Sequence, residues 1–196
     1  MLEARNISFS YNSQTLLFNN FSLSVNRGER VALQALSGKG KSTLCRLLAG
    51  YLKPDSGEVR CEGSPLPSKG VCPVQMIWQH PEKAVDPRMR MKDMLAEGGK
   101  TSDELLEQLG IKQTWLSRYP HELSGGELQR FCIARAFAAN PKYLIADEMT
   151  TMLDALTQAH IWKFFAEELK RRSIGLIFVS HSPALSKRIA SRTIKL

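Results

Sequence analysis

A strand, a glycine-rich loop and a helix follow one another near the start of the chain. Residues 35–43 read Ala-Leu-Ser-Gly-Lys-Gly-Lys-Ser-Thr. They fit the pattern G-x-x-x-x-G-K-[ST] at every defined position except the first, where Ala35 replaces glycine. An apolar strand at residues 30–34 precedes the loop, and a helical leucine stripe beginning at Leu44 follows it. A glycine turn would explain the glycines but not the Lys-Ser-Thr, so the segment predicts a P-loop in an α/β core.

The residue types in this loop suit phosphate binding. The loop N–H groups cradle phosphates, Lys41 reaches the β- and γ-phosphates, and the Ser42 hydroxyl ligates Mg²⁺. Ala35 strains the turn by about 1–2 kcal/mol if its position requires a left-handed conformation, and costs almost nothing otherwise. Lys39 adds a cation that either strengthens phosphate binding or points to solvent. The predicted nucleotide-binding residues of the loop are Ser37, Gly38, Lys39, Gly40, Lys41, Ser42 and Thr43.

A second anion-binding pattern lies far downstream, at residues 123–130. The sequence Leu-Ser-Gly-Gly-Glu-Leu-Gln-Arg places Ser124, Gly125 and Gly126 where a helix is expected to begin. Glycines let the backbone approach a ligand closely, and the helix directs free N–H groups and its positive dipole end at that ligand. This segment is therefore a second candidate phosphate site.

Polar residues follow several predicted strands at the point where each strand ends. Gln79 follows one strand, Asp147 and Glu148 follow another, and His181 follows a third. In open α/β sheets, ligands bind at the carboxyl ends of the strands, so these side chains should meet beside the P-loop. Mg²⁺ would stabilise a carboxylate after a buried strand, although Asp147 could also be an ordinary helix N-cap. Gln75 is an alternative candidate, but motif order and strand position favour Gln79.

Together these motifs make the chain resemble the ATP-binding cassette (ABC) ATPases, whose order is P-loop, Q-loop, signature, Walker B, D-loop and H-loop. The resemblance runs from about Tyr11 to His181. It implies ATP and Mg²⁺ as ligands, with Asp147 and Gln79 in the metal shell beside Ser42. It also implies catalytic roles for Gln79, for His181, which contacts the γ-phosphate, and for Glu148, which polarises the attacking water as the general base.

The resemblance further implies a second subunit. The signature helix contacts the γ-phosphate bound by another cassette, so two cassettes, identical or different, close around two nucleotides. Asp154 matches the D-loop, which runs between the subunits, and it is also a candidate N-cap for the following helix. Tyr11 falls where cassettes place an aromatic ring against adenine. Met149 stands where proline usually follows the Walker B glutamate, a change that loosens the backbone but removes no catalytic group.

Hydrophobic periodicity and turn signals predict the order of the elements. Strands are expected at about residues 2–9 and 18–25, with a turn at 11–13 between them. Three further strands, at 74–79, 143–146 and 174–179, have the aliphatic runs that are typical of a parallel sheet. A strong helix stop is expected at residues 53–57, helical structure from about 81 to 139 with a capping box at Thr101 and Glu104, and a helix at about 155–172.

These elements predict one α/β domain with a P-loop NTPase (RecA-like) core. The core has a parallel sheet, a small N-terminal antiparallel β part and an inserted helical subdomain. We expect the nucleotide-binding core at about residues 1–80 and 140–196, and the helical signature subdomain at about 81–139. A chain of 196 residues buries roughly 70% of its unfolded surface, enough for one compact domain.

Composition adds weaker constraints. No run approaches the roughly 18 apolar residues of a membrane span, and no signal-peptide pattern is present, so we expect a cytoplasmic protein. Cys45, Cys61, Cys72 and Cys132 show no C-x-x-C spacing and predict neither zinc nor disulfides. The net charge of +8 comes from basic residues spread along the chain, so no specific nucleic acid is expected.

The segment around the Q-loop resembles the peptide and nickel importer branch of the family. Residues 76–81 read Met-Ile-Trp-Gln-His-Pro, and Val-Asp-Pro-Arg follows at 85–88. The expected protein energises a membrane importer of peptides, nickel or a related small solute from the inner membrane face, with transmembrane permease subunits and a substrate-binding protein as partners. Residues 80–94 would meet the permease, with Met89, Met91 and Met94 as an adaptable surface, although methionines at near-helical spacing are more often core residues. The alternatives are a soluble non-transport ABC ATPase and a regulatory cassette with little turnover; the sequence leaves cargo and direction open.

Overall fold

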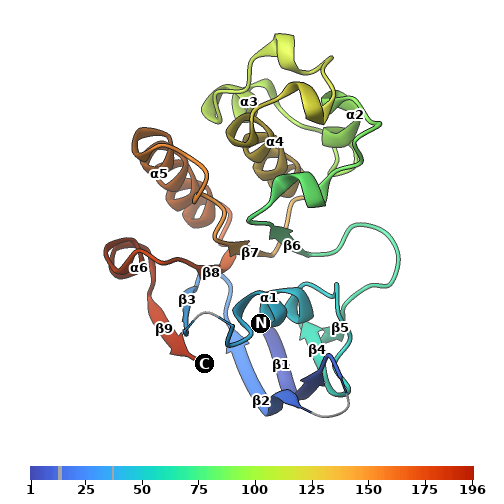
Figure 1. Ribbon diagram of the computed structural model, residues 1–196, viewed down its shortest axis with the longest axis vertical. Helices are drawn as coiled ribbons and strands as arrows, with labels where there is room; N and C mark the ends of the chain where they lie inside the picture. The colour runs from blue at the N-terminus through green and yellow to red at the C-terminus, as the bar shows by residue number, and fades with distance from the viewer. Residues whose placement is uncertain (13–14, 37) are drawn as a thin grey trace.

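The computed structural model describes residues 1–12, 15–36 and 38–196. Within this part the chain forms two β-sheets: the parallel sheet lies across the middle of the molecule, and the antiparallel sheet lies at one end (Figure 1). The antiparallel sheet has the order β2-β1-β4-β5, and the parallel sheet has the order β6-β7-β8-β3-β9. The strands are β1 (Leu2–Ser10), β2 (Leu16–Val25), β3 (Arg30–Gln34), β4 (Ser56–Cys61), β5 (Ser64–Pro65), β6 (Val74–Ile77), β7 (Tyr143–Asp147), β8 (Gly175–Val179) and β9 (Arg192–Lys195).

The parallel sheet is buried on both faces, as its aliphatic sequence predicts. Side chains of β7 alternate between two hydrophobic clusters: Tyr143 and Ile145 pack on one face, and Leu144 and Ala146 on the other. Strand β8 lies between β7 and β3, with Asp147 beside Val179 in the register. The carboxyl ends of β3, β6, β7 and β8 therefore lie along one edge, and the predicted α/β fold is confirmed.

The antiparallel sheet is larger than the two N-terminal strands that the sequence predicts. Strands β4 and β5 join it after the expected helix stop, in a region for which no strand was predicted. Gly57 has φ near +78°, and a Cβ atom there would lie 2.4 Å from the carbonyl oxygens of Arg5 and Asn6. Glycine is needed because β4 crosses an irregularity in β1 at this point.

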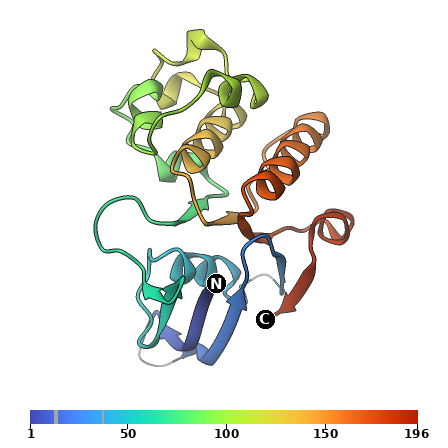
Figure 2. The same cartoon turned by 180° about the vertical axis from the view of Figure 1, so that it is seen from behind.

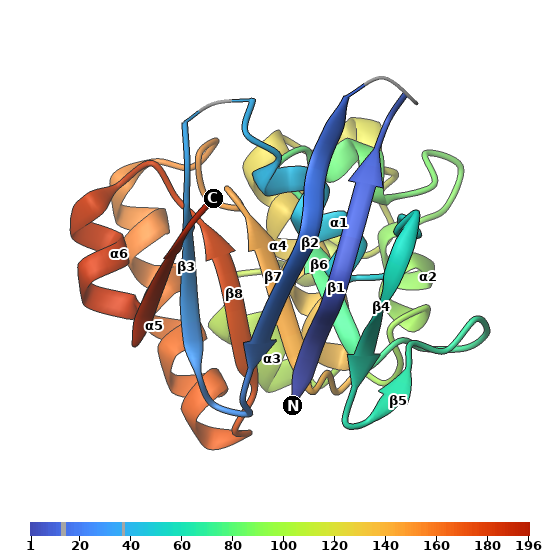
Figure 3. The ribbon, with the colours of Figure 1, turned by 90° about the horizontal axis from the view of Figure 1, so that it is seen from below.

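Helices lie on both sides of the parallel sheet. Helix α1 packs between the two sheets, behind the antiparallel sheet in Figure 3, and α2, α3 and α4 gather at the opposite end of the molecule (Figures 1 and 2). The α-helices are α1 (Lys41–Leu48), α2 (Met91–Ala96), α3 (Asp103–Gln108), α4 (Gly125–Ala138), α5 (Ala155–Arg171) and α6 (Pro183–Ile189). Short 3₁₀ helices are η1 (Pro81–Ala84), η2 (Gln113–Trp115) and η3 (Pro120–Glu122).

Several local predictions were wrong. The N-cap of α3 is Ser102, which accepts a hydrogen bond from the Leu105 N–H at 3.2 Å, so the predicted capping box at Thr101 is one residue early. Residues 81–139 form short helices joined by turns. Helix α6 and strand β9 were not predicted. Met91 and Met94 are buried residues of α2, so they are core residues, and the predicted permease-contacting surface does not include them.

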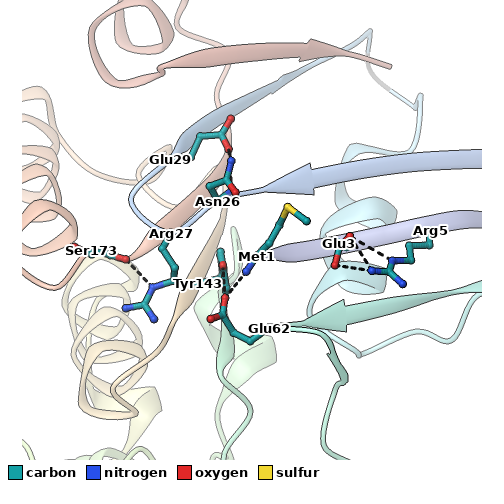
Figure 4. Close-up of polar contacts among 9 residues, drawn as sticks. All are labelled: Met1, Glu3, Arg5, Asn26, Arg27, Glu29, Glu62, Tyr143 and Ser173. Atoms are coloured by element: carbon teal, nitrogen blue, oxygen red, sulfur yellow. Dashed lines mark hydrogen bonds and ion pairs between the residues drawn. The ribbon is translucent and has the colours of Figure 1, made fainter.

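Polar contacts tie the two sheets together, as Figure 4 shows. The Tyr143 hydroxyl, at the start of β7, donates to Glu62 at 2.8 Å, and the Met1 amino group contacts the same carboxylate. These two donors hold the pKa of Glu62 below its usual range. Nearby, Arg27 donates to the Ser173 carbonyl at 2.8 Å (Figure 4). The contacts fix the N-terminal sheet against the strand that ends in Asp147.

None of the helices described is long and apolar enough to cross a membrane.

Candidate functional site

The P-loop connects β3 to α1. Gly40 caps α1 with φ near +87°, no side chain caps the first turn, and no acidic residue lies in it. The first N–H groups of α1 are therefore free to receive an anion. Lys41 Nζ donates to the carbonyl oxygens of Ala35 at 2.9 Å and Leu36 at 3.2 Å, which places the ammonium group over the loop. Ser37 lies outside the described residues.

The two unusual residues of this loop have different consequences. Ala35 is not among the described residues with positive φ, so the strain considered for a left-handed alanine does not arise. Lys39 is exposed between Gly38 and Gly40, both of which have positive φ. The added positive charge therefore lies at the open side of the loop.

Tyr11 lies beside the P-loop, although it follows β1. Its hydroxyl lies 3.0 Å from Oγ1 of Thr43, with either atom able to donate. Phe9 supports the ring edge-on, with centroids 5.0 Å apart, and 63% of Tyr11 remains exposed. An exposed aromatic ring held next to a phosphate loop is suited to stack on a flat base.

Asp147 ends β7 as a buried carboxylate, 5% exposed. Burial raises the pKa of Asp147, and a hydrogen bond with Ser42 partly offsets that rise. Its Oδ1 atom is buried without a hydrogen-bond partner in the described part of the chain. A buried carboxylate oxygen without a partner is costly, and a cation bound beside Ser42 would remove that cost.

Glu148 is held by residues from two other strand ends. Its Oε2 accepts from Gln79 Nε2 at 3.0 Å, and its Oε1 lies 2.8 Å from Nε2 of His181. The alternative glutamine, Gln75, donates instead to the Cys72 carbonyl. Glu148 also has φ near +48°, a conformation that costs a non-glycine residue energy and recurs at functional sites. The three predicted catalytic side chains thus lie together.

The signature segment forms a separate hollow. Ser124 caps α4: its Oγ accepts from the Glu127 N–H at 3.2 Å, and Glu127 accepts from the Ser124 N–H at 2.8 Å. Gly125, Gly126 and Asp154 line the same hollow of about 480 Å³. Asp154 caps α5 by accepting from the Thr157 N–H at 2.9 Å, so its N-cap interpretation fits the structure.

Comparison with known proteins identifies the family of this chain. Residues 18–151 match the family described as ABC transporter. The chain belongs to the ABC transporter family of ATP-binding cassettes. These cassettes are ATPases, and the hydrolytic class predicted from the six motifs is confirmed.

Relatives of this cassette include transport ATPases. It is 33% identical to the oligopeptide transport ATP-binding protein OppF of Streptococcus mutans, over 98% of this chain and 70% of that protein. It is 33% identical to the nickel import ATP-binding protein NikE of Rhodospirillum rubrum, over 100% and 80% of the two chains. A putative peptide import ATP-binding protein of Brucella abortus is 34% identical over 89% of this chain, which covers 58% of that relative's length.

Solved cassettes share the fold. The dimeric post-hydrolysis structure of the cassette MJ0796 bound to ADP and Pi has a TM-score of 0.86 at 24% identity, covering 100% of this chain and 94% of that one. An ATP-binding subunit of an ABC transporter has a TM-score of 0.87 at 24% identity, covering 100% and 85%.

The structure adds Arg46 and Arg130 to the residues that the sequence singled out, and it shows the surroundings of Met149. Arg46, on α1, places its guanidinium carbon 5.2 Å from the ring centroid of Trp78, just before Gln79. Arg130, in the signature helix, donates to the Leu109 carbonyl at 2.9 Å and so joins α4 to the end of α3. Met149 is buried in the core, 3% exposed. Only the proximity of Arg46 to Lys41 in sequence could have singled it out; pairing with Trp78 is a tertiary contact.

Proposed function

We propose that this cassette is the ATP-hydrolysing subunit of a membrane importer whose cargo is a peptide, nickel or a related small solute. The relatives named for oligopeptide transport and nickel import support this cargo class. The observation that carries the catalytic part is the placement of Glu148 between Gln79 and His181, one residue after a buried aspartate. It is the arrangement that an ATP-hydrolysing site requires.

Glu148 acts as the general base. Its carboxylate is only 13% exposed, and contacts with Gln79 and His181 fix both oxygens. A water between Glu148 and the γ-phosphate would be oriented for in-line attack and would give its proton to the carboxylate. His181, whose side chain is 61% exposed, faces the open side of the site, where it reaches the γ-phosphate and holds Glu148 in position.

The residues present fit a Mg²⁺ ion. Asp147 has a buried oxygen without a partner, and Ser42 lies beside it at the start of α1. Gln79 supplies an amide oxygen from the neighbouring strand end. No group of three or more His, Cys, Asp and Glu side chains in the described ranges is placed to hold a metal. ATP oxygens and water would supply the other ligands of the ion. When bound, the ion neutralises charge on the β- and γ-phosphates.

Nucleotide binding is divided between two chains. The loop residues 37–43 surround the phosphates, and Tyr11 stacks on adenine. Ser124, Gly125 and Gly126 lie in the separate hollow with Asp154, and we propose that this hollow receives the γ-phosphate bound by a second cassette. The functional unit is therefore a homodimer or heterodimer. The proposed domain consists of a core at about 1–80 and 140–196 and a helical part at about 81–139.

The remaining partners are permease subunits and a substrate-binding protein. We place the cassette on the inner face of the cell membrane, with residues 80–94 toward the permease. In that segment Arg88 is well exposed, with its guanidinium paired to Asp86 at 3.0 Å. Charge reversal at Arg88 should weaken assembly with the permease without changing ATP binding by the isolated chain.

Two measurements test the proposal. ATP turnover by the chain should fall by about 10²-fold or more in Glu148→Gln, the range expected for loss of a general base, while ATP binding persists. The chain should co-purify with permease subunits encoded alongside it. A turnover rate insensitive to Glu148 would refute its role as the general base. Failure of the chain to co-purify with any membrane protein would favour a soluble ATPase.

A further inference from the structure

Trp78 connects the catalytic residues to two other parts of the cassette. It follows β6 and immediately precedes Gln79. The Arg46 guanidinium lies over its ring at 5.2 Å, and Tyr51 packs against the ring edge-on with centroids 5.1 Å apart. The Trp78 carbonyl accepts a hydrogen bond from Gln129 Nε2 at 3.2 Å. Ring and backbone are thus held independently.

The residues that hold Trp78 come from functionally distinct elements. Arg46 lies on α1, the helix whose first turn forms the P-loop site, and Gln129 lies on α4, the helix that begins with the signature glycines. Tyr51 follows α1 and lines a hollow of about 950 Å³. Trp78 is therefore in contact with both phosphate-binding helices while its neighbour Gln79 holds Glu148.

Two polar side chains that contact Trp78 each have a buried atom without a hydrogen-bond partner in the described residues. Gln129 is 2% exposed, and its Oε1 has no partner among the described residues. The Nε atom of Arg46 is likewise buried without a partner in the described ranges. Unpartnered buried polar atoms destabilise a fold, and apolar side chains of similar size would avoid that cost. The polar groups of Arg46 and Gln129 instead provide the cation over the Trp78 ring and the hydrogen bond to its carbonyl.

We propose that Trp78 is a positioning residue for ATP hydrolysis: clamped by Arg46 and held at its carbonyl by Gln129, it fixes Gln79 against Glu148. This inference rests on the proposed hydrolytic function. A cation over the face of an aromatic ring restricts the ring, and a hydrogen bond to the carbonyl fixes the peptide that leads into Gln79. Because Gln129 lies on α4 and bonds the carbonyl next to Gln79, a movement of α4 would also move Gln79.

Kinetics of four variants test the role. Trp78→Leu, Arg46→Met and Gln129→Leu should each lower kcat by about tenfold with the KM for ATP unchanged, the pattern of an interaction made only in the transition state. Trp78→Phe keeps an aromatic face for Arg46 and should recover most of the rate. Gln129→Leu removes an unpartnered oxygen and also the donor to the Trp78 carbonyl. These effects oppose each other, so the melting temperature should change little; a structural role would lower melting temperature and rate together.

A matched control lies in the helical part. Trp115 is 7% exposed, and Lys112 places its ammonium 5.4 Å from the ring centroid, a similar cation–ring pair without contact to Gln79. Trp115→Leu should lower the melting temperature and leave kcat unchanged in the folded fraction. An equal loss of kcat in Trp115→Leu and Trp78→Leu would refute the positioning role.

A measurement without turnover separates this inference from the proposed function. The chain has three tryptophans, so fluorine NMR with fluorotryptophan gives resonances that Trp78→Phe assigns. Gln129→Leu should shift the Trp78 resonance. MgATP should shift this resonance in the Glu148→Gln single variant, and it should shift it much less in the double variant that also carries Gln129→Leu. An unmoved Trp78 resonance overturns the positioning role even if hydrolysis depends on Glu148. If turnover ignores Glu148, its role as the general base fails and the positioning role with it.

Discussion

Glu148 and His181 meet across the ends of two adjacent strands, with 2.8 Å between Oε1 of the glutamate and Nε2 of the histidine. Strands β7 and β8 pair in register up to Asp147 and Val179, so both strands end at the same level of the sheet. The contact depends on that register, because a slip of one residue would turn these side chains to the other face.

Replacing His181 should uncouple hydrolysis from binding. His181→Ala removes the contact that fixes Oε1 of Glu148, and we expect ATP turnover to fall by about 10²-fold with little change in ATP affinity. Turnover and nucleotide titration measure the two effects. His160→Ala is the control, since His160 contacts the Gln108 carbonyl, away from the strand ends. Similar losses in both variants would contradict the assignment.

Replacing Asp147 should make the nucleotide-free fold more stable and abolish ATP turnover. Burial raises the pKa of Asp147 in the folded chain. Between the pKa of the unfolded chain and that of the folded chain, the folded state therefore binds more protons than the unfolded state. The free energy of unfolding falls as pH rises through this range. At neutral pH the buried carboxylate is therefore unfavourable. Asp147→Asn should raise the free energy of unfolding without nucleotide and abolish Mg²⁺-dependent ATP turnover. Chemical denaturation at pH 7 checks the sign; destabilisation would contradict it.

Glu168 should stabilise the fold in the opposite pH direction. Its carboxylate is buried on α5 and paired with Arg171 at 2.7 Å and Arg172 at 2.6 Å, and the Arg171 hydrogen bond, together with the charges of both arginines, lowers the pKa of Glu168. The stabilisation is present above the ordinary glutamate pKa of about 4.3 and is lost as pH falls through the folded value. Glu168→Gln should cost about 2 kcal/mol at pH 7.

The neighbouring Glu167 supplies the control for that measurement, because it is exposed on the same helix. Glu167→Gln should change the unfolding free energy by less than about 0.5 kcal/mol. The difference between the two variants should shrink in denaturation experiments below pH 4, and a difference that stays constant with pH would argue against ion pairing.

The signature glycines should separate binding from dimerisation. A Cβ atom on Gly125 would meet only Met152 Sδ at 3.8 Å, whereas one on Gly126 would lie 2.9 Å from Leu153. Gly125→Ala should therefore fold normally and bind ATP as a monomer, yet block close approach of a second chain's phosphate. Sedimentation of Glu148→Gln with MgATP, with and without Gly125→Ala, measures the loss; undiminished dimerisation would count against a shared site.

Sequence patterns singled out the candidate site residues because motif spacing is local. The P-loop, the signature and the strand-end residues Gln79, Asp147 and His181 all stand at the ends of elements whose periodicity is readable. The N-cap of α3 was misplaced by one residue because Thr101 and Ser102 are both good caps. Strands β4 and β5 were missed because Pro and Gly dominate their surroundings, while pairing with β1 stabilises them.

Residue type and spacing along the chain were enough to assign the family and to place the P-loop, the signature and the candidate residues at the strand ends. They did not predict strands β4, β5 and β9 or helix α6. The tertiary structure decided which glutamine reaches Glu148, that Ala35 is unstrained, and that Met91 and Met94 are core residues. It also brought Arg46 and Gln129 to Trp78 from separate helices. Such contacts depend on how distant segments pack, which no local pattern records.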